Sequence, residues 1–212
     1  LVRIAAIAFE TQEAMVVTDS KTRILQVNKA FSEVTGYSAE EAVGRTPALL
    51  KSGYHEPEFY REMWVALKEH GSWRGEIWNR RKNGEIYPEW LTISAVRNSQ
   101  GETTHFVSTF IDITQRKEAE EQIQFLAFYD PLTRLPNRRL LHERLQLSLG
   151  SSIRRTCHAA LLVIDVDNFK TLNDSMGHDV GDLLLRQVAL RLRESVGSND
   201  TVARVGGDEF VV

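Results

Sequence analysis

Two adjacent carboxylates, Asp208 and Glu209, follow a pair of glycines at positions 206 and 207. Glycines let a turn adopt φ > 0, and they leave no side chains to block a ligand that approaches the turn. Carboxylate oxygens bind hard divalent cations, and such cations neutralise phosphate charge during phosphoryl transfer. Gly206-Gly-Asp-Glu209 also suits an ordinary β-hairpin turn, so phosphate chemistry needs support from other residues.

A second acidic pair ends the apolar run 159–167, which we predict to be a strand. Because strand side chains alternate, Asp165 and Asp167 would project on the same face and could begin a site for a hard cation. Lys170 follows within one turn and would place a positive charge near a bound phosphate. Aspartates at strand ends are also common on ordinary surfaces, so both interpretations of this pair stay open.

Asn173 and Asp182 lie beyond this strand, around a helix that we predict to reach about Val196 with Asp182 in its first turn. Both side chains could cap helix N-termini. An amide and a carboxylate could instead read the carbonyl and N–H groups of guanine. His178 is more readily structural than metal-ligating, because no second histidine or cysteine stands at metal spacing. The helix would turn its apolar side inward through Leu185, Val188, Leu192 and Val196.

The first half of the chain has different periodicity. We predict two short strands within 14–27, short helices after the capping box Ser38-Ala-Glu-Glu41 and after Pro57, and a three-stranded antiparallel meander from Trp73 onward. Phe59, Met63 and Leu67 recur at helical spacing after Pro57. A charged helical connector near residues 114–128 joins the two halves; it could form a parallel coiled coil or a solvated linker helix.

Composition narrows the class of protein. A net charge of -3 gives no general attraction to nucleic acid or to an anionic membrane, so we expect neither as a partner. Cys157 is the single cysteine, which excludes an intramolecular disulfide. The aliphatic run Ala159–Ile164 is far shorter than the roughly 20 residues of a membrane span. We expect a cytoplasmic segment without membrane contact, although other segments could attach the parent protein to a membrane.

Residues 8–114 resemble a PAS domain, a sensory module. The resemblance rests on the order of strands and helices and on three motifs: Asn28-x-Ala-Phe-x-x-x-Thr-Gly-Tyr37, Arg81-Lys-Asn-Gly84 and Asp112-Ile-Thr114. It implies a five-stranded antiparallel sheet around a pocket or a packed core, with an unknown ligand. The candidate cofactor contacts are Trp64, Trp73, Trp78 and Trp90, with His55 and His70 as possible haem ligands. Core packing of the tryptophans and surface or capping roles of the histidines are the preferred explanation.

Residues 129–212, after a linker helix at 115–128, resemble the GGDEF family of diguanylate cyclases. Four motifs carry the resemblance: Asp130-x-Leu-Thr-x-Leu-x-Asn-Arg138, Asp165-x-Asp-x-Phe-Lys-x-x-Asn-Asp174, Gly177-His-x-x-Gly-Asp182 and Arg204-x-Gly-Gly-Asp-Glu-Phe210. The resemblance implies a ferredoxin-like fold and condensation of two GTP molecules to cyclic di-GMP with release of pyrophosphate. The fold class is therefore α+β throughout.

The resemblance also implies roles for individual residues. Asp165, the carbonyl of Val166 and Asp208 would hold Mg2+ (or Mn2+), and Asp208 with Glu209 would be catalytic. The residues that would bind GTP are Phe169, Lys170, Asn173, Asp182, Gly206 and Gly207. Each protomer would bind one GTP, so the reaction would require a homodimer.

Two departures from the family pattern shape the expectations. Gly197 replaces the arginine of the usual Arg-x-x-Asp product site, so that inhibitory site is incomplete although Asp200 is present. The chain also stops before the family's later strands and helix, so we expect Val205–Val212 to lack an antiparallel partner and this fragment to be poorly folded after Leu149 and inactive. Two rival functions remain open: a GTP-binding regulatory GGDEF module that precedes a phosphodiesterase, and a PAS sensing and dimerisation module alone.

Overall fold

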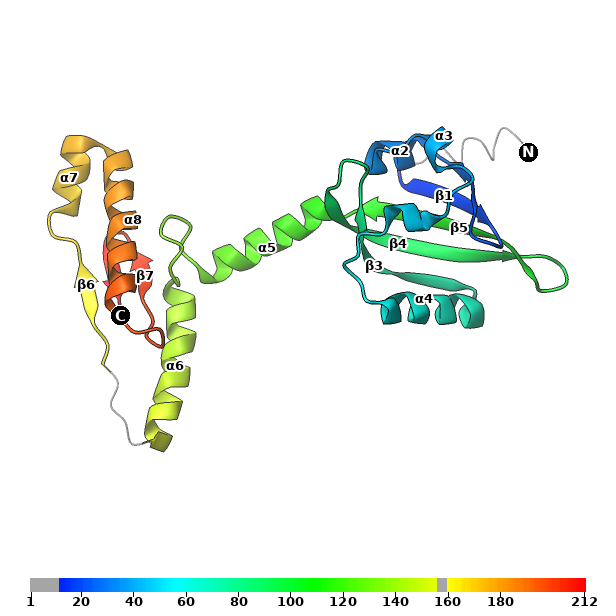
Figure 1. The fold of residues 1–212 in the computed structure, drawn as a ribbon. Coiled ribbons are helices and arrows are strands. Elements are labelled where there is room, and N and C mark those ends of the chain that lie inside the picture. Colours follow the sequence, from blue (N-terminus) through cyan, green and yellow to red (C-terminus); the bar gives the residue numbers. More distant parts are fainter. Residues whose placement is uncertain (1–11, 156–159) are drawn as a thin grey trace. The chain divides into compact units, whose positions relative to one another are not determined.

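A computed structural model describes residues 12–155 and 160–212. The chain divides into two compact units, with the boundary after Lys117 (Figure 1). Each unit has its own sheet and its own cluster of buried apolar side chains. The two sheets are considered separately because each positions one candidate site.

The first unit is built on a five-stranded antiparallel sheet. Its strand order is β2-β1-β5-β4-β3, with the strands β1 (Ala14–Asp19), β2 (Ile24–Val27), β3 (Ser72–Arg80), β4 (Ile86–Arg97) and β5 (Thr103–Asp112). The β3–β4 hairpin turns at the predicted Asn83-Gly84 pair, where Gly84 has a φ of 94°. The two predicted N-terminal strands and the predicted meander are therefore confirmed.

Short helices cover one face of this sheet: α2 (Lys29–Thr35), α3 (Ala39–Ala42), the 3-10 helix η1 (Pro47–Leu50) and α4 (Pro57–His70). The predicted capping box is present, because the Ser38 side chain accepts from the Glu41 N–H while the Glu41 side chain accepts from the Ser38 N–H. Proline opens α4 at its first position, as predicted, and Met63 and Leu67 are buried. These helices pack Phe31, Met63 and Leu67 against the inner face of the sheet.

Helix α5 (Thr114–Phe128) follows the last strand directly. Asp112 fixes its start, because one carboxylate oxygen accepts from both the backbone N–H and the hydroxyl of Thr114, at 2.8 and 2.6 Å. No residue of α5 is buried, and Ile123 and Leu126 are 67% and 48% exposed. These apolar side chains are thus exposed in the single chain, and both the coiled coil and the solvated linker stay predictions.

The second unit contains α6 (Arg138–Arg155) and a three-stranded sheet of order β6-β8-β7. Strands β7 (Ala203–Gly206) and β8 (Glu209–Val211) form a hairpin, and β8 pairs on its other side with β6 (Val163–Asp165). The expectation that Val205–Val212 lacks an antiparallel partner is therefore wrong. Two further backbone hydrogen bonds between Leu162 and Val212, at 2.8 and 2.9 Å, extend the β6–β8 pairing.

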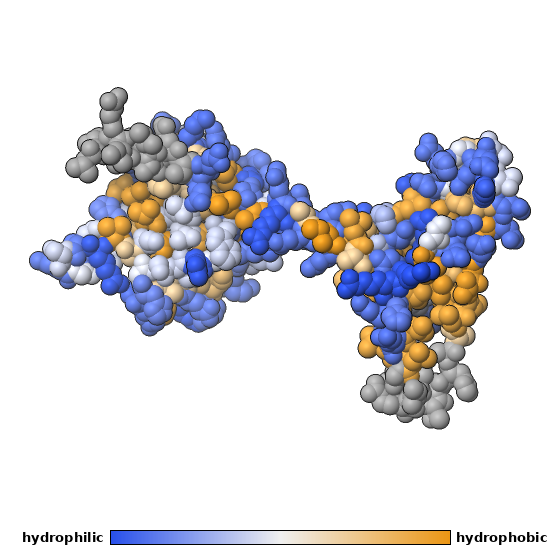
Figure 2. Space-filling model, turned by 180° about the vertical axis from the view of Figure 1, so that it is seen from behind, coloured by the Kyte–Doolittle hydropathy of each residue, from blue (hydrophilic) through white to orange (hydrophobic). Residues whose placement is uncertain are grey.

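Two helices pack on this sheet: α7 (Phe169–Met176) and α8 (His178–Ser195). Leu185 is buried, and Val188, Leu192 and Val196 pack partly buried against it with Phe210, as predicted. The predicted strand 159–167 is shorter than expected, since only Val163–Asp165 is a strand within its described part, residues 160–167. Leu161, Leu162 and Val163 are more than half exposed, and Figure 2 shows apolar surface on this side of the unit.

Candidate functional site

The glycine pair forms the tip of the β7–β8 hairpin. Gly206 and Gly207 have φ values of 155° and 49°, which side chains disfavour. A Cβ added at either glycine would meet no atom within 4 Å, so the backbone there is open to a ligand. Asp208 follows in the turn and Glu209 begins β8. The residues predicted to meet phosphates thus lie on an accessible hairpin tip, and the hairpin interpretation of the motif is also correct.

Strand pairing brings a second carboxylate to this tip. Asp165, the last residue of β6, lies directly opposite Glu209 in the antiparallel ladder, and both are exposed. Like charges in directly opposed positions are destabilising, and a bound cation would relieve the repulsion. Mg2+ is typically held in proteins by one or two carboxylates together with substrate phosphates, so this pair fits such an ion. Among the described residues no cluster of three or more potential metal-ligating side chains occurs.

Asp167 does not share the position of Asp165. The strand ends at Asp165, and Asp167 lies in the turn that leads into α7. The alternation of strand side chains therefore does not reach Asp167, and the predicted common face is not supported. Val166 lies between them, partly buried, and its carbonyl accepts from the N–H of Phe169 at 3.3 Å.

The residues predicted to bind nucleotide lie on the two helices. Phe169 and the exposed Lys170 open α7, and Asn173 is the fifth residue of that helix. The Asn173 Oδ1 is buried without a hydrogen-bond partner among the described residues, and it lies 1.9 Å from where a Cβ on Gly181 would be. Only glycine at 181 leaves room for this amide, so the α7–α8 contact depends on that pair.

Neither Asn173 nor Asp182 is a helix cap. Asn168 and Gly177 occupy the N-cap positions of α7 and α8, and Asp182 is the fifth residue of α8 rather than part of its first turn. The capping interpretation of Asn173 and Asp182 is therefore wrong. Asp182 is exposed beside buried Gly181, and the amide and the carboxylate lie on adjacent helices.

An ion pair fixes the hairpin against the start of the unit. Arg204 donates to both Asp130 oxygens at 3.0 and 3.1 Å, and it also donates from two nitrogens to the Gly207 carbonyl at 2.9 and 2.6 Å. Burial acts to raise the pKa of Asp130, but hydrogen bonds from Thr133 and the contact with Arg204 outweigh it, so the pKa lies below its usual value. No contact between Asp130 and Arg204 was predicted from the motifs, although each residue opens one of them.

The residues at the incomplete product site contact each other. Asp200 accepts from the N–H of Gly197 at 2.9 Å, and a Cβ at 197 would approach its oxygen to 3.0 Å. A cavity of about 310 Å³ includes both residues and is also lined by Arg144 and Arg193. Arginines therefore surround this position, although none stands at residue 197.

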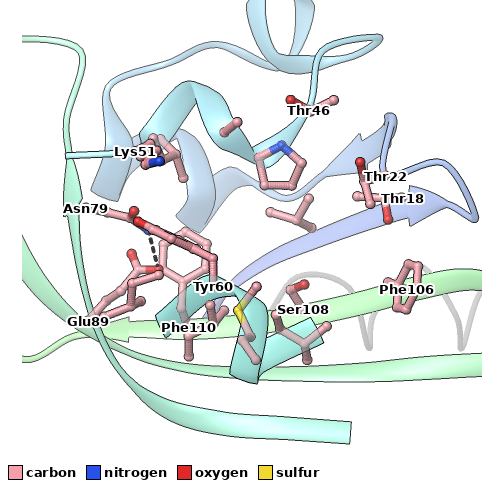
Figure 3. Close-up of a pocket in the computed structure, with 18 of the residues that line it drawn as sticks. Thr18, Thr22, Thr46, Lys51, Tyr60, Asn79, Glu89, Phe106, Ser108 and Phe110 are labelled. Atoms are coloured by element: carbon pink, nitrogen blue, oxygen red, sulfur yellow. Dashed lines mark hydrogen bonds between the residues drawn. The ribbon is translucent and has the colours of Figure 1, made fainter. Parts of the chain in front are cut away.

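The first unit contains a separate cavity of about 380 Å³ between the sheet and the helices (Figure 3). Of the four tryptophans only Trp64 lines it; Trp73 packs on the apolar core, Trp78 stacks on Tyr54, and Trp90 is 47% exposed on the sheet. His55 does not line it either: its Nε2 accepts from the Trp78 N–H at 2.9 Å while its ring stacks on Phe59. His70 is exposed at the end of α4.

One polar group inside this cavity was missed by the sequence analysis. Glu89 is 1% exposed; its Oε1 accepts from the amide of Asn79 at 2.9 Å and its Oε2 from the Tyr87 hydroxyl at 2.7 Å. Burial raises the pKa of Glu89 to about 7, although both hydrogen bonds act to lower it. The burial of Glu89 could have been predicted from the sequence. Side chains alternate along a strand, so Glu89 lies on the same inner face of β4 as Tyr87 and Leu91.

The sheet with its flanking helices defines a PAS-type sensor fold, and the glycine hairpin opposite an acidic strand end defines a GGDEF-type unit. Comparisons with known proteins agree: residues 12–115 match the family model of the PAS domain, and residues 127–212 match that of the diguanylate cyclase GGDEF domain. The chain thus carries a PAS domain followed by GGDEF-domain sequence.

Some relatives align with both parts of the chain and others with about half of it. The chain is 34% identical over its whole length to an uncharacterized signaling protein of Caulobacter vibrioides, of which it covers 25%. It is 30% identical over 93% of its length to the probable diguanylate cyclase DgcE of Escherichia coli, of which it covers 18%. It is 46% identical over 49% of its length to the bifunctional diguanylate cyclase/cyclic di-GMP phosphodiesterase MucR of Pseudomonas aeruginosa, of which it covers 15%. The chain therefore spans a quarter or less of the length of these relatives.

A solved PAS domain from Colwellia psychrerythraea aligns with 54% of this chain and 98% of its own, at 28% identity and a TM-score of 0.51. An RNA-binding light-oxygen-voltage receptor aligns with 59% of this chain and 36% of its own, at 28% identity and a TM-score of 0.53. None of the helices in the described part of the chain has the length and apolar character needed to cross a membrane.

Proposed function

We propose that the natural full-length protein is a sensor-regulated diguanylate cyclase in cyclic di-GMP signalling, which joins two GTP molecules into cyclic di-GMP and releases pyrophosphate. The observation that carries the proposal is the pairing of Asp165 with Glu209 beside an open glycine turn. The GGDEF family match and the similarity to a probable diguanylate cyclase support it.

In this proposal Asp165, the Val166 carbonyl and Asp208 hold Mg2+ (or Mn2+), which supplies neutralisation of phosphate charge. Lys170 and the backbone at Phe169 hold phosphates beside the open turn of Gly206 and Gly207. The exposed position of Lys170 on the first turn of α7 is compatible with that role.

Asn173 and Asp182 read guanine in this proposal. The amide of Asn173 has a buried oxygen without a partner, and the carboxylate of Asp182 is exposed on the neighbouring helix. An unpaired buried oxygen is costly, so retaining it is more consistent with a ligand contact than with packing alone.

Asp208 and Glu209 promote attack by the ribose hydroxyl. Each protomer binds one GTP, so the two hydroxyls meet the two α-phosphates only in a face-to-face homodimer. The PAS domain and α5 would control how often that arrangement forms.

The test is GTP turnover with Mg2+ by the full-length protein and by its Asp208→Ala and Glu194→Ala variants. Glu194 is an exposed carboxylate on the last turn of α8 and serves as the matched control. We expect cyclic di-GMP from the wild type and from Glu194→Ala but not from Asp208→Ala. The 212-residue chain is assayed in parallel, and turnover by it would contradict the expectation that it is inactive.

A second candidate is a GTP-binding regulatory module. Its support is similarity to the cyclic di-GMP phosphodiesterase PdeB of Shewanella oneidensis, 31% identical over 93% of this chain. GTP binding without product in the same assay would favour this alternative and reject the cyclase.

A further inference from the structure

The cavity of the first unit has the size of a ligand site. Its volume of about 380 Å³ lies within the range of about 300 to 1,000 Å³ that is typical of small-molecule pockets. Its walls are mostly apolar and come from the sheet on one side and from η1 and α4 on the other, including Val16, Met63, Ile77, Leu91 and Ile93. All of these residues belong to one compact unit.

Charged and amide side chains, with one tyrosine hydroxyl, lie at one end of this cavity. Figure 3 shows Lys51, Tyr60, Asn79 and Glu89 together at that end, whereas Thr18, Thr22, Thr46 and Phe106 lie toward the other. The Thr18 hydroxyl donates to the carbonyl of Asp19 at 3.1 Å. The end formed by Tyr60, Asn79 and Glu89 carries the phenol, amide and carboxyl groups of the cavity.

Tyr60 supplies a hydrogen-bond donor without a partner. Its hydroxyl is buried and makes no hydrogen bond among the described residues. Burial raises the pKa of Tyr60, so this hydroxyl keeps its proton at neutral pH. Buried tyrosine hydroxyls normally find a partner, and phenylalanine would fill the same space without an unsatisfied group.

Asn79 and Glu89 supply acceptors beside this donor. The Asn79 amide nitrogen donates to Glu89, and the oxygen of the same amide is a hydrogen-bond acceptor. Each Glu89 oxygen accepts one hydrogen bond from protein and has capacity for another. The polar end thus offers a donor next to acceptors.

The charges at this end favour a neutral ligand. The ionised form of Glu89 disfavours an anion, whereas the Lys51 ammonium, 4.7 Å from the centre of the Tyr60 ring, disfavours a cation. We propose that the cavity binds a neutral, largely apolar small molecule whose one polar edge combines an N–H donor for Asn79 and Glu89 with a carbonyl acceptor for Tyr60, as in a lactam.

The test measures binding to the purified chain by isothermal titration calorimetry and does not depend on the proposed cyclase activity. The probe is quinazolinone, a flat bicyclic lactam, and the matched probe is its ring N-methyl derivative, which lacks the N–H donor. We expect submillimolar binding of quinazolinone and about 3- to 10-fold weaker binding of the methylated probe, equivalent to one lost hydrogen bond.

Tyr60→Phe removes only the unpartnered hydroxyl. We expect it to weaken quinazolinone binding by a similar 3- to 10-fold, equivalent to about one hydrogen bond, while leaving the unfolding midpoint unchanged or higher. Tyr37→Phe is the control, since Tyr37 is also partly buried but lies outside the cavity. Equal affinity of the two probes, no quinazolinone binding at millimolar concentration, or unchanged binding by Tyr60→Phe would overturn the proposal.

Discussion

Replacing Glu89 by glutamine should change how the stability of the PAS domain depends on pH. The pKa of Glu89 is raised from 4.5 to about 7 in the folded state. Between these values the folded protein keeps a proton that the unfolded chain has released, so raising the pH favours unfolding. The contribution of Glu89 is fully present below its unfolded pKa and is lost as the pH rises through about 7. A difference of this size corresponds to about 3 kcal/mol.

Glu89→Gln removes this titration but keeps a side chain of similar shape. Any fixed cost of its altered hydrogen bonds shifts the whole stability curve without adding pH dependence. Relative to the wild type, the variant should gain about 2 to 3 kcal/mol between about pH 5 and pH 8. His55 has a lowered pKa, mainly because of burial, and acts in the opposite direction. It is present in both proteins and largely cancels in the difference.

The assay is urea unfolding followed by tryptophan fluorescence, because all four tryptophans lie in the first unit. Glu62→Gln makes the same chemical change at an exposed position of α4 and should track the wild type at every pH. A stability difference between Glu89→Gln and wild type that stays constant with pH would refute the raised pKa. It would mean that the hydrogen bonds from Asn79 and Tyr87 fully offset the burial of the carboxylate.

Three further substitutions test other contacts. Arg204→Lys should destabilise the second unit by about 2 kcal/mol in urea unfolding, because one ammonium cannot both contact the two oxygens of partly buried Asp130, as Nη1 does, and replace the Nε and Nη2 donors to the Gly207 carbonyl; no measurable loss would show that lysine replaces these contacts equally well. Arg81→Gln should raise the pKa of Glu89 further, since Arg81 acts to lower it; NMR titration of the labelled carboxyl carbon measures the change, and an unchanged or lower value would refute the coupling. Gly207→Ala should cost about 1 kcal/mol for its positive φ alone, because a Cβ meets no neighbour; a much larger loss would reveal a steric requirement.

The strands and helices of the first unit could be predicted because their signals are local. The Asn83-Gly84 turn and the Ser38 capping box each act within a few residues, and both are present. The helix starts of the second unit were predicted less well. Asn168 and Gly177 precede α7 and α8 with φ values of 58° and 86°, so left-handed backbone rather than a side-chain cap sets each boundary.

The candidate sites needed information that spacing does not carry. The opposition of Asp165 and Glu209 depends on the β6–β8 register, which joins residues 44 apart in the chain (209 minus 165). The order of the motifs indicated that these carboxylates act together. It did not indicate which carboxylate of β8 lies opposite Asp165 of β6. The Asn79–Glu89 pair lies within one hairpin. The position of Glu89 on the inner face of the sheet could be predicted from the alternation of side chains along β4.

The cavity is physically connected to the start of α5. Glu89 accepts from Tyr87, the Arg81 guanidinium lies 3.8 Å from the centre of the Tyr87 ring, and Arg81 pairs with Asp112, which holds Thr114 at the first turn of the helix. Arg81 acts to lower the pKa of Glu89, so their charges interact. Because such coupling is reciprocal, the same interaction makes ionisation of Glu89 favourable for the Arg81 guanidinium, which also pairs with Asp112 at the start of α5.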